Sequence, residues 1–202
     1  GAGAVEIAFK GETLGQLRWT LAGRHNLHNA LAAIAAARHA GISPGVSLAA
    51  LAKFNGVKRR LETRGVVDGI TVYDDFAHHP TAIDATVGAL RARIGSARLV
   101  AVLEPRSNTM RMGMLKDELP ASLAAADRVY CYTANLGWDA DGALAALGAR
   151  LETHDYLPSL IEAIAADARA GDHVLIMSNG GFGGIHDKLL ARLRLRGTPD
   201  GS

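Results

Sequence analysis

The chain opens with two short segments in which apolar and polar residues alternate. Residues 5–9 (VEIAF) and 16–21 (QLRWTL) follow this pattern, and Gly11 and Gly15 lie between them. Alternation with a period of two is typical of a strand with one buried face, and glycines between two such segments favour a turn. The pattern therefore predicts a β-hairpin.

After the hairpin the apolar period becomes that of a helix. From Asn26 to His39 the apolar residues recur at spacings of three and four, and Gly41 follows them. This spacing predicts a helix that ends near His39. A second, shorter helix is expected over residues 47–54, with a turn at residues 43–45.

Beyond residue 60, short apolar segments alternate with helical ones. The apolar segments are residues 70–73, 99–103, 129–132 and 174–177, and the helical ones are residues 81–93, 115–125, 140–147, 159–168 and 186–195. Strands and helices that alternate at these lengths are typical of parallel βαβ units. We therefore expect an α/β fold with a Rossmann-like, open and mostly parallel sheet flanked by helices.

The two patterns meet at residues 55–60, where the apolar content drops and three basic residues stand together. We place a domain boundary there, because a change of pattern at a polar segment is typical of a linker. A small α+β unit is expected over residues 1–55 and the α/β unit over residues 56–202.

Composition restricts the partners and the compartment. The chain has 202 residues, 22 Lys and Arg against 20 Asp and Glu, and a formal charge of +2. No dense basic stretch interleaved with aromatic residues occurs, so nucleic acid is not an expected partner. No apolar run reaches the roughly 18 residues that cross a bilayer, so a membrane is not expected either. The single cysteine, Cys131, excludes a disulfide framework and favours a reducing cytoplasm.

Polar residues follow three of the predicted strands directly. They are residues 74–80 (DDFAHHP), 104–109 (EPRSNT) and 178–184 (SNGGFGG). In an open parallel sheet, ligands bind outside the carboxyl ends of the strands. We therefore expect these three loops to converge on one edge of the sheet.

The first loop contains paired carboxylates and paired histidines. Asp74-Asp75 and His78-His79 are residue types that bind divalent cations, but neighbouring residues at a strand end point to opposite sides, so a protein metal site is not favoured. The functional hypothesis is one carboxylate that accepts from a hydroxyl and one histidine that donates to an anion. The alternative is a solvated strand end, with Pro80 at the start of a helix.

The other two loops suit the binding of anions. The guanidinium of Arg106 can hold a carboxylate or phosphate with two hydrogen bonds, and a solvated surface arginine is the alternative. The glycine-rich loop at residues 178–184 precedes a helix, whose first N–H groups can receive an anion. A dinucleotide site is not favoured, because its fingerprint belongs to the first βαβ unit and this loop follows the last strand.

Two asparagines stand near the start of the first predicted helix. Asn26 and Asn29 are three residues apart, so they share a face of its first turn. Carboxamides can pair with the donor and acceptor edge of adenine. The alternative is that Asn26 caps the helix and Asn29 has no role.

In order, five motifs of the chain resemble those of the Mur ligases. They are residues 23–29 (GRHNLHN), 59–62 (RRLE), 73–81 (YDDFAHHPT), 104–110 (EPRSNTM) and 178–184 (SNGGFGG). Each motif is weak alone, but the ordered set covers essentially the whole chain, and the third and fourth are most similar to the murein peptide ligase branch. The resemblance implies that residues 1–55 end a central ATPase domain and that residues 56–202 form a C-terminal, Rossmann-like domain.

The resemblance also implies an activity. A Mur ligase of this branch joins UDP-N-acetylmuramate to the murein tripeptide L-alanyl-γ-D-glutamyl-meso-diaminopimelate in peptidoglycan recycling, through an acyl phosphate, with ATP and Mg²⁺. One alternative is UDP-N-acetylmuramate:L-alanine ligase, which uses the same route with a single amino acid. Another is a non-catalytic module that binds a peptide or a nucleotide.

Roles for individual residues follow from the matched motifs. Catalytic roles are implied for Arg60 and His78, and nucleotide binding is implied for Asn26, Asn29, Arg60 and Asp75. Peptide binding is implied for His78, Arg106, Ser107, Asn108, Ser178, Asn179, Gly180 and Phe182.

The sequence departs from the family in one respect. No Gly-x-x-x-x-Gly-Lys-[Ser/Thr] motif occurs in it, and that loop cradles the triphosphate and helps to hold Mg²⁺. The chain also begins without Met. We therefore expect a C-terminal part of a longer ligase that is inactive alone, with the main Mg²⁺ ligands in the preceding part. The oligomeric state is not predicted.

Overall fold

The computed structural model describes residues 4–19, 21, 24–54 and 56–196. The chain divides into two compact units, Gly1–Lys58 and Arg59–Ser202, and each is described by itself. Three predicted features involve residues outside the described ranges: the end of the second predicted strand at Thr20, Gly23 of the first motif, and Asn55 at the expected boundary.

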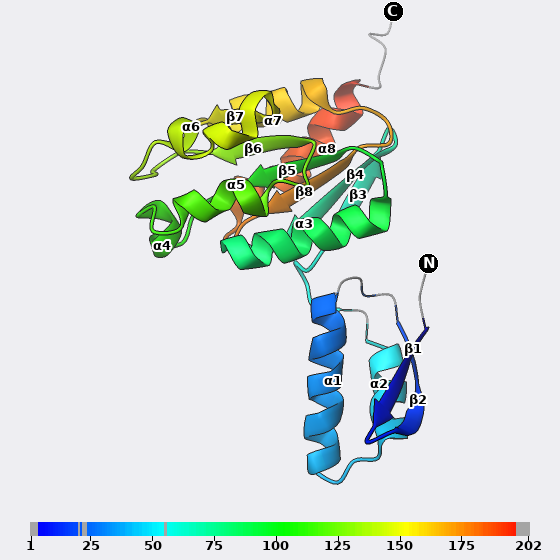
Figure 1. Cartoon of the computed structure of the whole chain (residues 1–202). Coiled ribbons are helices and arrows are strands. Elements are labelled where there is room, and N and C mark those ends of the chain that lie inside the picture. The colour runs from blue at the N-terminus through cyan, green and yellow to red at the C-terminus, as the bar shows by residue number, and fades with distance from the viewer. Residues whose placement is uncertain (1–3, 20, 22–23, 55, 197–202) are drawn as a thin grey trace, which may run out of the picture. The chain divides into compact units, whose positions relative to one another are not determined.

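The first unit is a hairpin packed on two helices (Figure 1). Strands β1 (Ala4–Phe9) and β2 (Glu12–Arg18) pair antiparallel, and helices α1 (Arg24–His39) and α2 (Pro44–Ala52) follow. Its core consists of Ile7, Leu17, Trp19, Ala30, Ile34 and Leu48. The hairpin and both helices were predicted, but α2 begins at Pro44, which the sequence placed in a turn. Proline suits the first helical position because its fixed φ is helical and it has no N–H to leave unpaired.

The second unit contains a six-stranded sheet with the order β3-β4-β8-β5-β6-β7. The strands are β3 (Glu62–Val67), β4 (Ile70–Asp75), β5 (Leu99–Leu103), β6 (Arg128–Tyr132), β7 (Leu151–His154) and β8 (His173–Met177). Of the pairs of neighbouring strands in this sheet, β3 and β4 are antiparallel and the other four are parallel. The predicted α/β fold with a mostly parallel sheet is confirmed.

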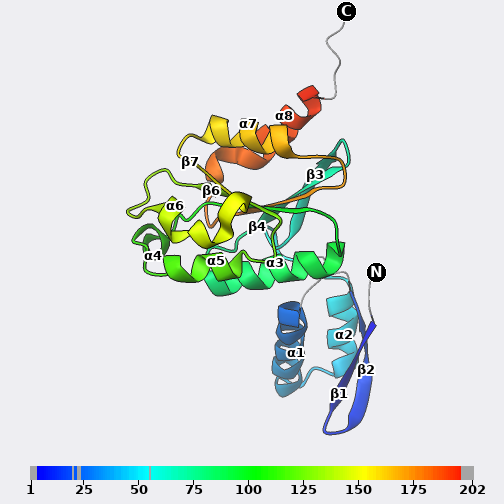
Figure 2. The ribbon, with the colours of Figure 1, turned by 45° about the horizontal axis from the view of Figure 1, so that its top comes forward.

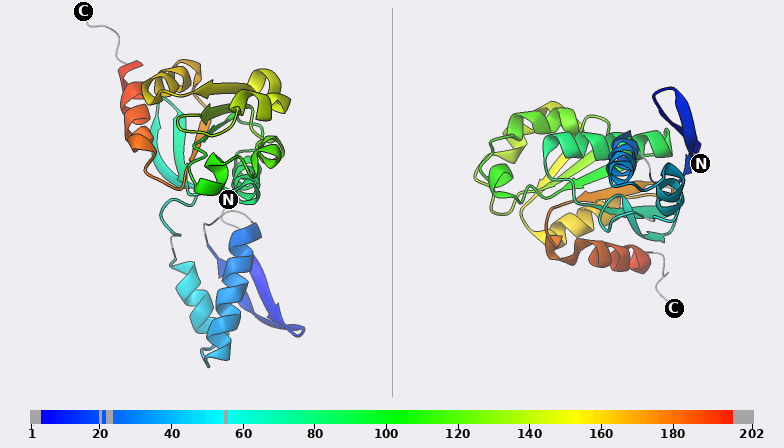
Figure 3. Two further views of the ribbon diagram at one scale, coloured as in Figure 1. Left: turned by 90° about the vertical axis from the view of Figure 1, so that its left-hand side faces the viewer. Right: turned by 90° about the horizontal axis from the view of Figure 1, so that it is seen from below.

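Helices cover both faces of this sheet, as Figure 2 and the view from below in Figure 3 show. Helices α3 (Pro80–Ile94) and α5 (Leu119–Ser122) pack on one face, and α7 (Leu157–Asp167) and α8 (Ile185–Arg196) pack on the other. Shorter helical segments lie in the connections: α4 (Asn108–Arg111), η1 (Lys116–Glu118), α6 (Ala140–Ala143), η2 (Ala145–Arg150) and η3 (Phe182–Gly184). In β4, β5, β6 and β8 the residues alternate between the two apolar cores, so these four strands are buried on both faces.

Both edge strands, β3 and β7, were missed by the sequence pattern. An edge strand pairs on one side only and does not need a continuous apolar run. Strand β3 also has a register shift between Thr63 and Gly65, which breaks its alternation. The helix predicted over residues 115–125 is instead η1 followed by α5, because Pro120 cannot donate a hydrogen bond to the preceding turn.

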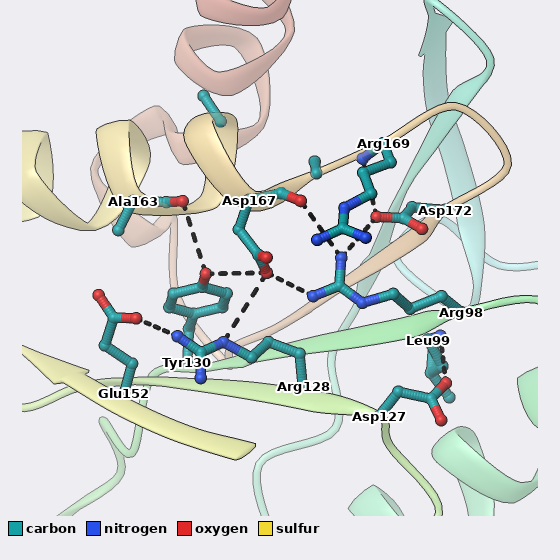
Figure 4. Close-up of polar contacts among 12 residues, drawn as sticks. Arg98, Leu99, Asp127, Arg128, Tyr130, Glu152, Ala163, Asp167, Arg169 and Asp172 are labelled. Carbon is teal, nitrogen blue, oxygen red and sulfur yellow. Dashed lines mark hydrogen bonds and ion pairs between the residues drawn. The ribbon is translucent and has the colours of Figure 1, made fainter. Parts of the chain in front are cut away.

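Ion pairs tie the amino ends of the central strands to α7 (Figure 4). Arg98 donates to Asp167 at 2.5 Å and to Asp172 at 2.8 Å. Asp167 also accepts from the hydroxyl of Tyr130 at 3.2 Å, and Arg128 pairs with Glu152. This network lies at the opposite end of the strands from the three polar loops, and it links the sheet to α7. Within the described part of the chain, no helix combines the length and apolarity that a membrane span requires.

Candidate ligand site at the carboxyl edge of the sheet

Three polar loops meet where β4, β8 and β5 end side by side. The backbone N–H of Ser178 donates to the carbonyl of Asp75 at 3.1 Å, and that of Glu104 donates to the carbonyl of Met177 at 3.0 Å. Each loop is therefore joined to its neighbour at the first residue after the strand. The predicted convergence is confirmed, because strand order places β8 between the other two.

Asp74, near the end of β4, is buried among cationic side chains. Its carboxylate is 2% exposed and receives the Nε of Arg59 at 3.2 Å to both oxygens. Arg64 Nη1 lies 3.5 Å away and His186 Nε2 lies 3.4 Å away. Burial lowers the pKa of His186, although the charge of Asp74 raises it, so the ring is neutral at pH 7 and the two arginines balance Asp74.

Asp75 is equally buried, and both of its oxygens accept hydrogen bonds. Oδ2 accepts from the N–H of Leu61 at 2.7 Å, and Oδ1 accepts from the N–H of Ala77 at 2.8 Å and from Thr86 at 3.3 Å. Burial raises the pKa of this carboxyl, and the two N–H groups and the nearby charge of Arg60 offset only part of that effect. The geometry therefore supports a clamp on the surrounding loops better than the predicted contact with a ribose.

Arg60 and His78, which carry the predicted catalytic roles, both lie near the ring of Phe76. The guanidinium of Arg60 lies 6.0 Å from the centre of the Phe76 ring, and the ring of His78 meets it edge-on at 5.3 Å. His78 Nδ1 lies 2.9 Å from the carbonyl of Phe76, which can only accept, so Nδ1 carries a proton. In the neutral ring Nε2 is then the acceptor and could receive a proton.

Arg106 lies against the backbone of Gly180, so the loops after β5 and β8 form one surface. A Cβ added to Gly180 would lie 2.5 Å from Cζ and 2.8 Å from Cδ of Arg106. In the same loop as Gly180, the hydroxyl of Ser178 donates to Glu104 and accepts from the N–H of Gly180 at 2.9 Å. Arg106 itself is exposed, and Ser178 is 1% exposed. Ser178 therefore supports the loop, and Arg106 is the group that can reach a ligand.

The remaining predicted peptide contacts differ in accessibility. Ser107 caps α4 by accepting from the N–H of Met110 at 3.4 Å, and Asn108 is exposed. Asn179 Oδ1 is buried and has no hydrogen-bond partner among the described residues. Phe182 is 1% exposed, and its ring packs 5.5 Å from that of Tyr132, so the ring belongs to the core rather than to a ligand surface. Its φ of +41° lies in the left-handed region that residues other than glycine rarely adopt, which the sequence pattern did not reveal.

The two asparagines lie on α1, in the first unit. Because α1 begins at Arg24, Asn26 is inside its first turn and does not cap it. Asn26 is half-buried and Asn29 is exposed. Their contact with adenine stays a prediction.

Arg59 is a residue of the RRLE motif to which the sequence analysis assigned no role. Its Nη2 donates to the carbonyl of Ser178 at 2.6 Å, in addition to its pair with Asp74. The only sequence signal was its place beside Arg60, because no local pattern reports a contact between residues 119 positions apart.

The described residues contain no preformed cluster of metal ligands. No group of three or more His, Cys, Asp or Glu side chains among them could hold a metal ion. The oxygens of Asp74 and Asp75 already face Arg59, Leu61 and Ala77. No step is therefore assigned to a metal bound by these residues.

Comparison with known proteins identifies the family. The family model described as "Mur ligase, glutamate ligase domain" matches residues 59–180. The UDP-N-acetylmuramate–L-alanyl-γ-D-glutamyl-meso-2,6-diaminoheptandioate ligase of Escherichia coli (strain K12) is 50% identical over 187 residues, which are 92% of this chain and 41% of that protein. The UDP-N-acetylmuramate–L-alanine ligase of Synechococcus sp. (strain JA-3-3Ab) is 46% identical over 114 residues, 56% of this chain and 22% of that protein.

A solved structure agrees with the sequence matches. The crystal structure of a murein peptide ligase from Psychrobacter arcticus 273-4 is 42% identical, has a TM-score of 0.73, and matches 92% of this chain and 40% of its own. The chain therefore spans less than half the length of these relatives. Because the family model covers more than half of the chain, the chain belongs to the Mur ligase family.

Proposed function

We propose that this chain is the C-terminal part of an ATP-dependent ligase that joins UDP-N-acetylmuramate to L-alanyl-γ-D-glutamyl-meso-diaminopimelate. The observation that carries the proposal is the exposed guanidinium of Arg106 on the surface where three loops meet. The tripeptide offers carboxylates on its glutamyl and diaminopimelyl residues, and a guanidinium is suited to bind them. The 50% identity to the Escherichia coli tripeptide ligase supports this choice of substrate.

The proposed reaction has two steps. The muramate carboxylate attacks the γ-phosphorus of ATP, which releases ADP and leaves an acyl phosphate. The amine of the tripeptide then attacks the acyl carbon, loses a proton and displaces phosphate, which forms the amide. UDP-sugars and ATP are cytoplasmic substrates, so we place the ligase in the cytoplasm.

Residues of this chain take specific parts in that reaction. Arg60 is exposed and positively charged, and we assign it to the phosphate oxygens, where charge builds up. His78 has Nε2 available as an acceptor, which suits it to take the proton of the attacking amine. Arg106, with Asn108 beside it, would bind a peptide carboxylate. In the first unit, which we propose to be the end of the ATPase domain, Asn26 and Asn29 would face adenine.

The decisive experiment is phosphate release by the longer protein that carries this chain. With ATP and UDP-N-acetylmuramate present, we expect release with the tripeptide to exceed release with L-alanine. Replacing Arg106 with Ala should raise the KM for the tripeptide roughly ten- to hundredfold, since a charge-assisted contact is worth about 1.5–3 kcal/mol. The KM for UDP-N-acetylmuramate should change little.

Two other results would replace the proposal. Faster release with L-alanine would favour the alanine ligase, for which the match to the Synechococcus sp. protein over 56% of the chain is the supporting observation. No release with either acceptor would favour a binding module. For the 202-residue chain alone we expect weak or no ATP binding by calorimetry, because its sequence has no phosphate-cradling loop.

A further inference from the structure

Arg59, the first residue of the second unit, is held in place by both its backbone and its side chain. Its N–H donates to Glu62 Oε2 at 2.8 Å, and its carbonyl accepts from the N–H of Phe76 at 2.8 Å. The side chain donates through Nε to Asp74 at 3.2 Å and through Nη2 to the carbonyl of Ser178 at 2.6 Å. Its backbone has a φ of +60°, a conformation that residues other than glycine rarely adopt.

These contacts connect segments that are distant in the sequence. Asp74 is the penultimate residue of β4, and Ser178 is the first residue after β8. A guanidinium can satisfy both at once, because Nε and Nη2 are separate donors in one rigid plane, whereas lysine has a single nitrogen. Asp74 is 2% exposed and the Arg59 side chain is 27% exposed, so the carboxylate is shielded from water and its hydrogen bonds to the guanidinium are stronger than in water.

Arg106 belongs to the loop after β5, but its side chain packs against the loop that Arg59 holds. The hydroxyl of Ser178 accepts from the N–H of Gly180, and Arg106 covers Gly180. A shift of the Ser178 carbonyl would therefore move the surface that sets the place of the Arg106 guanidinium.

We propose that Arg59 is a positioning residue: through Asp74 and the Ser178 carbonyl it holds the loop at residues 178–180, and thereby the Arg106 guanidinium, in place for an anionic ligand. The identity of that ligand as the peptide rests on the proposed function. The positioning itself does not, because it follows from contacts within this chain.

Arg64 offers a matched control. It also lies beside Asp74, at 3.5 Å, but its hydrogen bond is to Asp187 on α8, away from the loop. Replacing Arg64 with Ala removes one positive charge beside Asp74, as replacing Arg59 does, but it leaves the hydrogen bond to the Ser178 carbonyl in place. Replacing Arg59 with Gly removes the side chain, and glycine adopts the left-handed backbone of this position without strain. The variant therefore tests the loss of the side chain without disturbing the backbone. Replacing Arg59 with Lys keeps the charge.

The test on the chain itself is hydrogen exchange of individual amides by NMR. We expect the amides of Ser178 and Gly180 to exchange about tenfold faster in Arg59→Gly, the effect of losing one charge-assisted hydrogen bond. Arg59→Lys should lie between this variant and the parent, Arg64→Ala should match the parent within about twofold, and the amides of β5 should be unchanged. Equal acceleration in the Arg59 and Arg64 variants, uniform acceleration that includes β5, or no acceleration would overturn the proposal.

A second measurement uses the ligase that carries this chain. Arg59→Gly should raise the KM for the tripeptide about tenfold with a smaller change in kcat, and Arg59→Lys should restore part of the loss. If the parent protein shows no ligase activity, the proposed function fails, while the exchange result still decides whether Arg59 positions the loop.

Discussion

Replacing Gly180 with alanine tests whether the place of Arg106 on the loop surface matters. The added Cβ would lie 2.5 Å from Cζ and 2.8 Å from Cδ of Arg106, and closer still to Nη1. These distances are too short for real atoms, so one side must move. Gly180 does not have a left-handed φ, so the alanine backbone is not strained, and the flexible Arg106 side chain is the part that gives way.

The structure predicts different effects on stability and on binding. Arg106 is exposed, so its side chain can move into solvent with little loss of stability. Alanine also reduces the conformational freedom of the unfolded chain, which offsets part of that loss. We therefore expect the free energy of unfolding to change by less than about 1 kcal/mol. If Arg106 binds the peptide as proposed, a displaced guanidinium loses a charge-assisted contact of about 1.5–3 kcal/mol, which corresponds to a KM for the peptide roughly ten- to hundredfold higher.

The neighbouring glycine supplies the control for this prediction. Gly181 has a φ of −76° and a ψ of −7°, and a Cβ added there would meet no atom within 4 Å. Both alanine variants would be compared by urea unfolding of the chain and by peptide kinetics of the ligase that carries it. A normal peptide KM in Gly180→Ala, or an equal rise in Gly181→Ala, would refute the reasoning.

Three further predictions concern the rest of the second unit. Replacing Asp167 with Asn removes the carboxylate that Arg98 and Tyr130 share (Figure 4), and we expect the free energy of unfolding in urea at pH 7 to fall by about 2 kcal/mol; a loss below about 0.5 kcal/mol would contradict this. Burial raises the pKa of Asp167, but the hydrogen bond and the charge of Arg98 lower it by a larger amount. The pKa of this carboxyl therefore lies below its usual value. The stabilisation by Asp167 is therefore complete above about pH 4 and is lost as the pH falls through the lowered pKa. The difference in the free energy of unfolding between the chain and Asp167→Asn should accordingly shrink below about pH 4. A difference that stays constant with pH would contradict the lowered pKa of Asp167. Burial raises the pKa of the Cys131 thiol to about 12, so a thiol reagent at pH 8 should label the chain in urea and leave the native chain unlabelled, and rapid native labelling would exclude the buried position.

The central strands and their helices could be predicted from the sequence alone. Strands β5 and β8 are buried on both faces, so they require continuous apolar runs, and such runs are visible without a structure. The edge strands β3 and β7 have no such requirement and were missed. The three polar loops were found because ligands bind at the carboxyl ends of parallel strands, whichever family the chain belongs to.

The tertiary structure alone decided which residues of the predicted site are exposed and which are buried. Asp75 and Phe182 stood in the expected motifs, yet both are buried, and Arg59 stood in a presumed linker, yet it bridges β4 and β8. The sequence by itself determined the α/β pattern and the places of the loops, because a buried strand or helix requires apolar residues at regular spacings along the chain. Which loops touch depends on the order β4-β8-β5. That order pairs His173 with Thr71, 102 positions away, and with Leu99, 74 positions away, so a local sequence pattern cannot reveal it.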